Sequence, residues 1–556
     1  MIGDALHLEF LGMAKQTTIG KYLVHRLEEI GLKHVFGVPG DYVLSFFDLL
    51  VDSRMQLVGT CAELGAGYAA DVYARVHGIG GLCITYCVGG LSALNAVAGA
   101  YAEKSPLVVI SGSPGVSERT RSPLLHHQVK DFQTQLEIYE KCTVAAVALE
   151  DAERAPRQID DAIQACLWHK RPVYIEIPRD RVNVPCEPPR PLKPRVARSD
   201  KAPLAEAVAE AVEMLRKAKR PVILGGVEIH RYGLQEDLSK LIDHSGFPFT
   251  TTLLGKSIIT ERHPQFVGVY HGALSTDAVR KTVEGADCLL ILGAFLTDLA
   301  LGVFTAKLDE SRTIKANFDR ITIKHHHFEN VYLPEFMRGL ASARLGTRRR
   351  PGKLRPEPQP FRARSDKPIT VKRLFEKIND YLTHTDIVVC DVGDSLFGAA
   401  DLTIHRRTEF IGPAFYTSMG ISIPGATGAQ IARRDLRPIV IVGDGAFQMT
   451  ANELSTVVRY GLNPIILLIN NKGYTTERVI HEGPYNDVHP WDYHQMPAVL
   501  RGGWGCEVRT EGELEQALVV ARGRRDDFSL LNIHTDPMDC SQGLVRLGQR
   551  LGMRVQ

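Results

Sequence analysis

The stretch Pro438-Ile-Val-Ile-Val-Gly-Asp-Gly445 is an apolar run that ends in a polar turn, and Pro464-Ile-Ile-Leu-Leu-Ile-Asn-Asn471 repeats that design. Short runs that are apolar at every position are typical of strands buried on both faces of a parallel sheet. Neighbouring parallel strands have their carboxyl ends at the same edge of the sheet. We therefore expect Asp444 and Asn471 to emerge at the same carboxyl edge, where sheets of this kind bind ligands.

The residue types at this edge fit a divalent cation that holds a diphosphate. Mg²⁺ prefers octahedral oxygen ligation at about 2.0–2.1 Å, takes one or two protein side chains and completes its shell with phosphate and water. Asp444, the side-chain oxygen of Asn471 and a backbone carbonyl near Gly473 meet that need. An ordinary Gly-Asp-Gly turn is the alternative for the tripeptide alone. The second strand and the asparagine pair favour the cation site.

A helix is expected behind this turn. Thr450-x-x-Glu453 has the pattern of a capping box, and Gly461 would end the helix that the box opens. The start of this helix would turn a positive dipole end toward the phosphates.

Composition limits the partners. The chain has 556 residues, with Lys+Arg 66 against Asp+Glu 64, so no net field favours nucleic acid or an anionic membrane. Its 10 cysteines lack the CxxC pairs of a zinc or redox centre, which indicates reduced thiols and a cytoplasmic protein. No apolar stretch reaches the ~18–20 residues of a membrane span.

Two proline- and arginine-rich stretches, Val184–Pro203 and Gly346–Lys367, read as linkers. They divide the chain into three predicted domains, residues 14–190, 200–345 and 366–556. Each domain alternates apolar strands with helical patterns, so we expect three α/β domains with parallel sheets covered by helices. The first helix is expected over Ile19–Ile30. The expected strands are Val35–Phe36, Leu82–Val88, Leu107–Ser111, Pro172–Ile177, Pro221–Leu224, Cys288–Leu292, Ile387–Cys390, Pro438–Val442, Pro464–Ile469 and Leu530–Ile533.

Five motifs in fixed order carry a resemblance to a known family. They are Phe36-Gly-Val-Pro-Gly-Asp41, Ala62-Glu63-Leu64, His126-His127, Gly443-Asp444-Gly445 and Asn470-Asn471-Lys-Gly-Tyr-Thr-Thr-Glu477. With them the chain resembles the thiamine-diphosphate-dependent 2-oxo acid decarboxylases, which act on pyruvate, branched-chain, indolepyruvate or phenylpyruvate substrates. The resemblance implies a pyrimidine-binding, a central and a diphosphate-binding domain. It also implies thiamine diphosphate with Mg²⁺, and conversion of a 2-oxo acid to an aldehyde and CO₂ through an enamine intermediate.

The same resemblance assigns roles to residues. Glu63 matches the glutamate that activates the pyrimidine ring, and Met419 matches the apolar residue that keeps the cofactor bent. Asp41, His126, His127 and Glu477 match the groups that handle protons. The cofactor-binding set is Glu63, Thr417, Met419, Gly443, Asp444, Gly445, Ala446, Asn471 and Gly473, and the metal ligands are Asp444, Asn471 and Gly473.

Each motif also has an ordinary interpretation. Glu63 could be a glutamate at a helix start, Met419 core filler, and the histidine pair a cap or a surface loop. The run His325-His326-His327 matches no family motif, and we expect it on the surface rather than around a metal.

Val392, Leu396, Thr476 and Ile480 fall where the family lines its acyl pocket. Thr476 is smaller than the aliphatic side chain of pyruvate-specialised members, so we expect a preference for long aliphatic or aromatic 2-oxo acids. A helix with Leu544, Leu547 and Leu551 would close the pocket. A pyruvate decarboxylase, a carboligase of the acetohydroxyacid synthase type and a scaffold without activity are the alternatives. The family resemblance further implies a homodimer as the minimal active unit and a homotetramer as the usual assembly.

Overall fold

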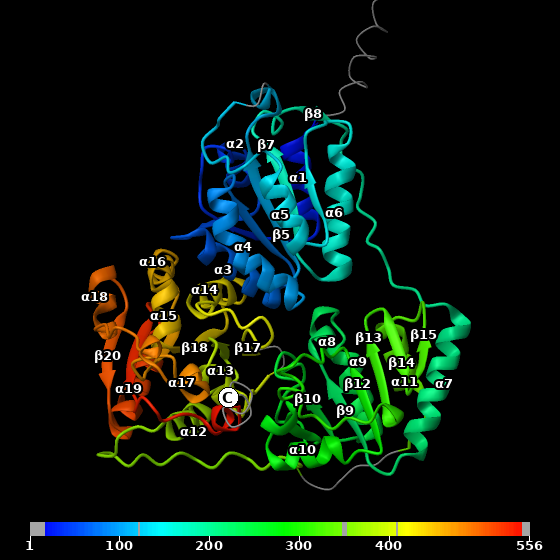
Figure 1. Cartoon of the computed structure of the whole chain (residues 1–556), viewed down its shortest axis with the longest axis vertical. Helices are drawn as coiled ribbons and strands as arrows, with labels where there is room; N and C mark the ends of the chain where they lie inside the picture. Colours follow the sequence, from blue (N-terminus) through cyan, green and yellow to red (C-terminus); the bar gives the residue numbers. More distant parts are fainter. Residues whose placement is uncertain (1–16, 121–122, 347–352, 407–409, 548–556) are drawn as a thin grey trace, which may run out of the picture. The chain divides into compact units, whose positions relative to one another are not determined.

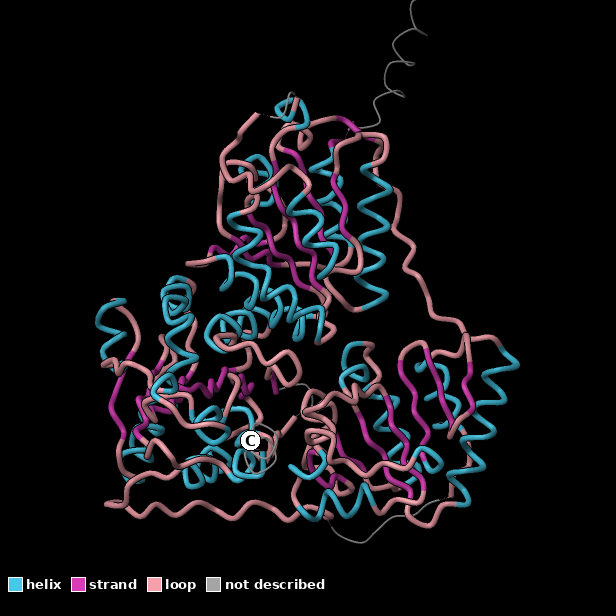
Figure 2. The backbone as a smooth tube through the Cα atoms, viewed as in Figure 1, coloured by secondary structure: helices cyan, strands magenta, loops and turns pink. Residues whose placement is uncertain are grey.

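The computed structural model describes residues 17–120, 123–346, 353–406 and 410–547. By their contacts the chain divides at Arg195 into two compact units. The middle and last segments of the sequence belong to the second unit together, so the three predicted domain ranges stay a prediction. Figure 1 shows the helices and strands with their labels, and Figure 2 shows the same backbone coloured by secondary structure.

The first unit is built on a six-stranded sheet of order β3-β2-β4-β5-β7-β6, in which every pair of neighbours is parallel. Its strands are β2 (His34–Gly37), β3 (Gln56–Gly59), β4 (Gly80–Ile84), β5 (Leu107–Ser113), β6 (Ala146–Ala148) and β7 (Val173–Pro178). Its helices are α1 (Ile19–Glu29), α2 (Leu44–Val51), α3 (Glu63–His77), α4 (Val88–Ala102), α5 (Thr134–Cys142) and α6 (Ala155–His169). The strand order reverses between β2 and β4, which is where such sheets bind ligands.

The middle segment forms a seven-stranded sheet of order β11-β10-β9-β12-β13-β14-β15. Its strands are β9 (Pro221–Gly225), β10 (Phe249–Thr251), β11 (Phe266–Val269), β12 (Cys288–Leu292), β13 (Thr313–Asn317), β14 (Arg320–Ile323) and β15 (His326–Phe328). The expectation of a parallel sheet is wrong at one edge, where β14 and β15 run antiparallel. Their short turns allow only hairpin pairing, since a parallel crossover needs a dozen residues or more.

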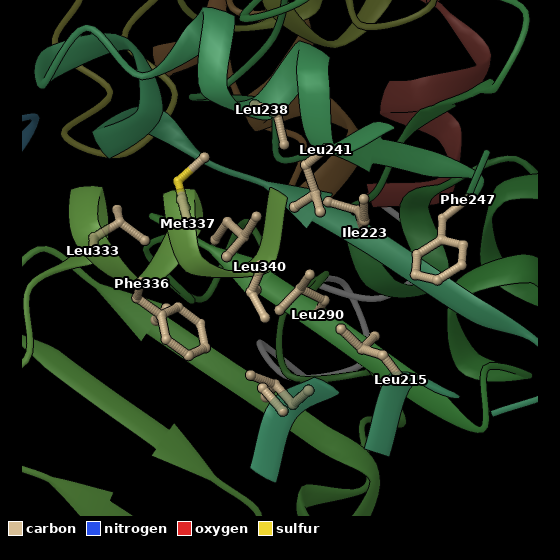
Figure 3. Close-up of a cluster of buried hydrophobic side chains, with 14 of the residues drawn as sticks. Leu215, Ile223, Leu238, Leu241, Phe247, Leu290, Leu333, Phe336, Met337 and Leu340 are labelled. Carbon is tan, nitrogen blue, oxygen red and sulfur yellow. The ribbon is translucent and has the colours of Figure 1, made fainter. Parts of the chain in front are cut away.

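Helices α7 (Lys201–Lys217), α9 (Gln235–Ser245) and α11 (Leu333–Ser342) pack around this sheet, and α8 (Val227–Arg231) and α10 (Asp277–Glu284) complete the segment. Figure 3 shows how their apolar side chains meet those of β9 and β12, with Met337 and Leu340 of α11 close to Leu241 of α9 and Leu290 of β12. All four are buried. This core includes none of the residues that line the candidate site, and it stabilises the fold of the middle segment.

The last segment forms a six-stranded parallel sheet of order β17-β16-β18-β19-β21-β20. Its strands are β16 (Asp386–Cys390), β17 (Phe410–Ile411), β18 (Arg437–Gly443), β19 (Ile465–Asn470), β20 (Trp504–Val508) and β21 (Ser529–His534). Its helices are α12 (Val371–Tyr381), α13 (Asp394–Ala399), α14 (Ser422–Ala432), α15 (Asp444–Thr450), α16 (Leu454–Arg459), α17 (Thr475–Ile480), α18 (Met496–Leu500) and α19 (Glu511–Gly523). Strands β18 and β19 are direct neighbours, which confirms the arrangement predicted from their sequences.

A buried ion pair joins the middle and last segments within the second unit. Lys256 Nζ lies 2.7 Å from Glu261 Oε1, and both side chains are fully buried. Lys256 also donates to the carbonyls of Ala400 and Leu402, and Glu261 accepts from the backbone N–H of Ile404. One charged pair of the middle segment therefore binds backbone of the last segment.

Three local predictions are wrong. The linker Val184–Pro203 contains β8 (Pro185–Cys186), which pairs with β1 (Thr17–Thr18), and ends inside α7, whose first turn tolerates Pro203 because no N–H is needed there. The strand expected over Leu82–Val88 ends at Ile84, and Cys87 turns the chain with a φ of +47°. The capping box at Thr450 does not form.

In place of that box, the helix begins at Asp444, directly after the strand, and Thr450 is its last residue. The Thr450 hydroxyl donates to the carbonyl of Gly420, and the Glu453 carboxylate accepts from Thr456. A 3₁₀ turn, Ala451–Glu453, then leads into α16. The N–H groups of the first turn, which have no acceptor within the helix, therefore lie next to Gly445.

No helix among the described residues combines the length and apolar character that crossing a membrane requires. The 10 cysteines, all within the described residues, form no disulfides; five of them are buried and only Cys61 is exposed. His325, His326 and His327 are exposed, as expected. Leu551 lies outside the described residues.

Candidate active site

A cavity of about 530 Å³ lies at the carboxyl edge of β18 and β19. The register of these strands pairs Gly443 with Ile469, so the residues that follow each strand emerge side by side. Predicted site residues that line the cavity are Val392, Met419, Gly443, Asp444, Gly445, Ala446, Asn471, Gly473, Thr476 and Glu477. Residues far apart in the sequence therefore line one cavity.

Asp444 is a buried carboxylate at the first position of α15, and only 1% of it is exposed. It accepts a hydrogen bond of 2.8 Å from the N–H of Gly445. Burial raises the pKa of Asp444 to about 6, while the N–H groups of Gly445, Lys472 and Gly473 and the charge of Arg478 act in the opposite direction. Such a group lacks a close counter-cation among the described residues, and a divalent ion would supply one.

Asn471 carries the clearest sign of a missing partner. Its side-chain Nδ2 donates to the hydroxyl of Thr475, whereas its Oδ1 is buried without any hydrogen-bond partner. Buried side-chain oxygens are normally paired, so an orphan that lines a cavity indicates a ligand. Lys472 next to it has a φ of +59°, and Gly473 has no room for a Cβ, which would lie 2.3 Å from the carbonyl oxygen of Asn486.

Gly443 and Gly445 give the cavity its backbone floor. A Cβ at Gly443 would meet no atom within 4 Å and would project into open space, and one at Gly445 would lie 2.3 Å from the ring of Tyr474. A diphosphate can approach backbone of this kind closely. The donor set of one carboxylate, one amide oxygen and one loop carbonyl fits Mg²⁺.

Met419 lines the cavity from a loop that two elements hold. The buried carboxylate of Asp391, at the end of β16, accepts from the N–H groups of Gly420 and Ser422, each at 3.0 Å. Thr450 of α15 holds the carbonyl of Gly420 at 2.7 Å. Thr417 precedes this clamp with a φ of +56° and lies outside the cavity lining.

Two of the four residues predicted for the acyl pocket line the cavity. Val392 and Thr476 line the cavity, but Leu396 and Ile480 do not. Leu396 is fully buried in the core, because α13 begins at Asp394 and turns this side chain toward Gly412. Leu544 and Leu547, from helical residues 542–547, pack on Phe397 and on the middle segment and do not line the cavity.

The structure adds lining residues that sequence reasoning missed. His481 and Tyr485 line the cavity with parallel rings whose centroids are 6.5 Å apart. His481 follows Glu477 by four residues, a helical spacing that could have indicated it. Asp394 also lines the cavity, and its carboxylate accepts from the N–H of Ser541 at 2.9 Å and from the Ser541 hydroxyl.

Three of the predicted proton-handling residues meet in the first unit. Asp41 follows β2, and its Oδ2 lies 2.8 Å from Nε2 of His126. The rings of His126 and His127 are 4.8 Å apart, and Tyr42 stacks on His126 at 4.6 Å. Ligand atoms of Asp41, His126 and His127 all lie within 4.8 Å of one another. The cluster can pass a proton between neighbouring groups.

Glu63 starts α3 directly after β3, with Ala62 as its extended N-cap. The carboxylate packs against Gly89 of α4, where an added Cβ would lie 3.4 Å from Glu63 Oε1, an ordinary contact distance. Glu63 and Asp41 thus follow neighbouring strands at the carboxyl edge of the first sheet. Glu477, exposed on α17, belongs to the second unit.

Two α/β units with ligand-binding edges, one of which combines a buried carboxylate, an orphan amide oxygen and a glycine floor, define a cofactor-dependent enzyme of the diphosphate-binding class. Models of thiamine pyrophosphate enzymes match the chain in three parts. They are the N-terminal TPP binding domain at residues 17–138, the central domain at 208–338 and the C-terminal TPP binding domain at 391–533. The chain belongs to the thiamine pyrophosphate enzymes, and within them to the 2-oxo acid decarboxylases that its motifs resemble.

Its relatives carry two kinds of name. Pyruvate decarboxylase 1 of Zea mays is 36% identical over 555 residues, covering 96% of this chain and 90% of that protein. The alpha-keto-acid decarboxylase of Mycobacterium avium is 36% identical over 540 residues, covering 95% of this chain and 96% of that protein. Overall identity does not distinguish between the two names.

Proposed function

We propose that this protein catalyses the non-oxidative decarboxylation of a 2-oxo acid to an aldehyde and CO₂, with thiamine diphosphate and Mg²⁺ bound in the cavity of the second unit. The single observation that carries the proposal is the orphan Oδ1 of Asn471, buried in the same cavity as the carboxylate of Asp444. These two atoms and a carbonyl of the loop at Gly473 would hold the cation. When bound, thiamine diphosphate supplies an electron sink for the bond that breaks.

The chain's own residues have three tasks. Gly443 and Gly445 admit the diphosphate to the backbone, and Met419, clamped by Asp391 and Thr450, limits the shape that the ligand adopts. Glu63 would hold a proton at its carboxyl group for exchange with the pyrimidine ring. Its place at the start of α3, packed against Gly89, supports this role.

Release of an aldehyde needs one proton delivered to carbon and one removed from oxygen. We assign these transfers to Asp41, His126, His127 and Glu477. The contact of 2.8 Å between Asp41 and His126 supports a shared proton, and imidazole changes its charge near neutral pH.

For the substrate we propose long aliphatic or aromatic 2-oxo acids in preference to pyruvate. Thr476 and Val392 leave room in the cavity wall, and the rings of His481 and Tyr485 add an aromatic side. A pocket enlarged by a methylene or two discriminates by about 1–3 kcal/mol, or 10–200-fold.

We further propose a cytoplasmic homodimer as the smallest active unit, with a homotetramer as the full assembly. Large apolar side chains near the candidate residues support a covering partner surface, since Val88 is 51% exposed and Met449 47% exposed. Ten free cysteines are in keeping with a reducing compartment.

A substrate panel tests the proposal. The protein, Mg²⁺ and thiamine diphosphate are incubated with pyruvate, 2-oxoisocaproate or phenylpyruvate, and aldehyde formation is measured. We expect aldehyde in each case, with the highest kcat/KM for the larger acids. Acetolactate without aldehyde would indicate a carboligase instead, and an equal or higher kcat/KM for pyruvate would overturn the substrate preference. Glu63→Gln should retain cofactor binding and lose turnover, so wild-type turnover would remove Glu63 from its role.

A further inference from the structure

The loop that offers two of the three proposed metal ligands is not held by the sheet alone. Asn471, Lys472 and Gly473 lie between β19 and α17. Lys472 has a left-handed φ of +59°, a conformation that residues other than glycine adopt at an energetic cost. A strained loop needs contacts that favour this one shape over others.

Arg478 provides such contacts from inside. Its side chain is 5% exposed, and its guanidinium reaches back from α17 beneath the loop. Nη1 donates to the carbonyl of Asn471 at 3.2 Å, and Nη2 donates to the carbonyl of Lys472 at 2.9 Å. A Cβ on Gly473 would lie 2.5 Å from Nη2, so the guanidinium packs directly against the glycine. One rigid fork therefore touches every residue of the loop.

The guanidinium also anchors the loop to two other segments of the chain. Nη2 donates to Oδ1 of Asp487 at 2.7 Å, and Nη1 donates to the carbonyl of Pro537 at 3.3 Å. Gly473 and Asp487 form an isolated antiparallel bridge, and the N–H of Val488 donates to the carbonyl of Lys472. Arg478 lies at the centre of this junction.

Resting on the proposed function, we propose that Arg478 is a positioning residue, which holds residues 471–473 in the shape that presents the Oδ1 of Asn471 and the carbonyl of Gly473 to the divalent cation. Its charge alone would do the reverse, since a guanidinium near a cation site repels the cation. Its fixed planar fork, which a lysine cannot copy, is what the loop requires. Partners that orient metal ligands in this way typically matter 10–100-fold in metal affinity.

The two effects have opposite signs, so one measurement separates them. Thiamine diphosphate is bound to the cofactor-free protein at a series of Mg²⁺ concentrations, and binding is followed by isothermal titration calorimetry. We expect Arg478→Met to raise the Mg²⁺ concentration for half-saturation at least tenfold, with kcat at saturating Mg²⁺ and cofactor within about threefold of wild type. Arg478→Lys should resemble Arg478→Met.

Arg437 offers a matched control. It is also buried, at 3% exposed, and donates to two backbone carbonyls, those of Asn463 and Arg522, at the opposite end of β18. Arg437→Met should leave the Mg²⁺ dependence within twofold of wild type. An equal loss in Arg437→Met would show general destabilisation and overturn the inference.

Other outcomes are equally decisive. Unchanged or tighter Mg²⁺ binding in Arg478→Met, or wild-type binding in Arg478→Lys, would overturn the inference, because the site would then not need the planar fork of Arg478. Should Arg478→Met fail to fold, Asp487→Ala removes one acceptor of the guanidinium at a side chain that is 68% exposed. That variant should shift the Mg²⁺ dependence about threefold, and no shift would overturn the inference. A wild-type protein that binds no thiamine diphosphate with Mg²⁺ would instead refute the proposed function itself.

Discussion

Replacing Lys256 by methionine should reduce the free energy of unfolding by about 3–5 kcal/mol. Lys256 and Glu261 are both fully buried, and Lys256 Nζ lies 2.7 and 2.8 Å from the two carboxylate oxygens. Without Lys256 the buried carboxylate of Glu261 keeps only Arg355 as a counter-charge, with Nη1 at 3.8 Å. Loss of the near partner of a buried pair accounts for this magnitude. The carbonyls of Ala400 and Leu402 lose their donor as well. Urea unfolding followed by circular dichroism measures the loss as a lower midpoint.

The double variant Lys256→Met with Glu261→Gln should recover about 2 kcal/mol, because it no longer buries the Glu261 charge without its near partner. Lys217→Met serves as the control, since the pair of Lys217 with Glu213 is 75% and 66% exposed and should contribute less than about 1 kcal/mol. Neither buried residue lines the cavity, so kcat of the folded protein should stay unchanged. A loss below 1 kcal/mol in Lys256→Met, or no recovery in the double variant, would refute this account of the junction.

Three further predictions concern the cavity. Thr476→Ile should narrow it and lower the ratio of kcat/KM for phenylpyruvate over pyruvate by about 10–200-fold; an unchanged ratio would exclude Thr476 from the acyl pocket. Asp391→Asn, which loses an acceptor for Gly420 or Ser422, should lower kcat at least tenfold by loosening Met419 while calorimetry shows nearly unchanged cofactor affinity, and wild-type kcat would contradict the clamp. Burial raises the pKa of Asp394 from 3.8 to about 6. The folded protein therefore holds this proton more tightly than the unfolded chain does. Its free energy of unfolding should fall by up to ~3 kcal/mol as the pH rises from 4 to above 6. Asp394→Asn has no such titration. The unfolding free energy of wild type minus that of the variant, measured by urea unfolding, should therefore be smaller at pH 7.5 than at pH 4.5. An equal difference at both pH values would contradict the raised pKa.

Strands and strand-end residues were predictable because they depend on local pattern. The runs at 438–442 and 464–469 are apolar throughout, and a buried parallel strand is the short element that suits them. Once two such strands are neighbours, the residues after them must meet, which is why Asp444 and Asn471 share a cavity in the structure.

Side-chain direction was predictable only where the start of the element was known. Leu396 seemed to face the acyl pocket, but α13 starts at Asp394, so two residues of helical rotation carry Leu396 into the core. The capping pattern at Thr450 failed for a related reason. The turn after β18 already starts the helix at Asp444, and the Thr450 hydroxyl, left at the helix end, binds Gly420 instead.

Contacts between distant segments were out of reach for pattern reasoning. Arg478 reads in sequence as one more charged residue on an exposed helix turn. It is buried because Asp487 and the carbonyl of Pro537 come from chain that folds back over the loop, and both partners lie outside any helical spacing. A sequence motif can name the ligands of a cation, but the groups that hold those ligands in place come from tertiary structure.

In the proposed function the two units would divide the chemistry, and the surroundings of their residues differ accordingly. The proposed cation ligands are dry, since Asp444 is 1% and Asn471 5% exposed, and a dry site strengthens every charge interaction with a diphosphate. The pair proposed to handle protons is exposed to water: the side chains of His126 and Asp41 are 54% and 43% exposed. Water screens such a pair and offers competing proton partners, so cover that excludes water would favour the proposed transfer to carbon. The proposed assembly would supply that cover, and dilution to the separated subunit should then lower activity.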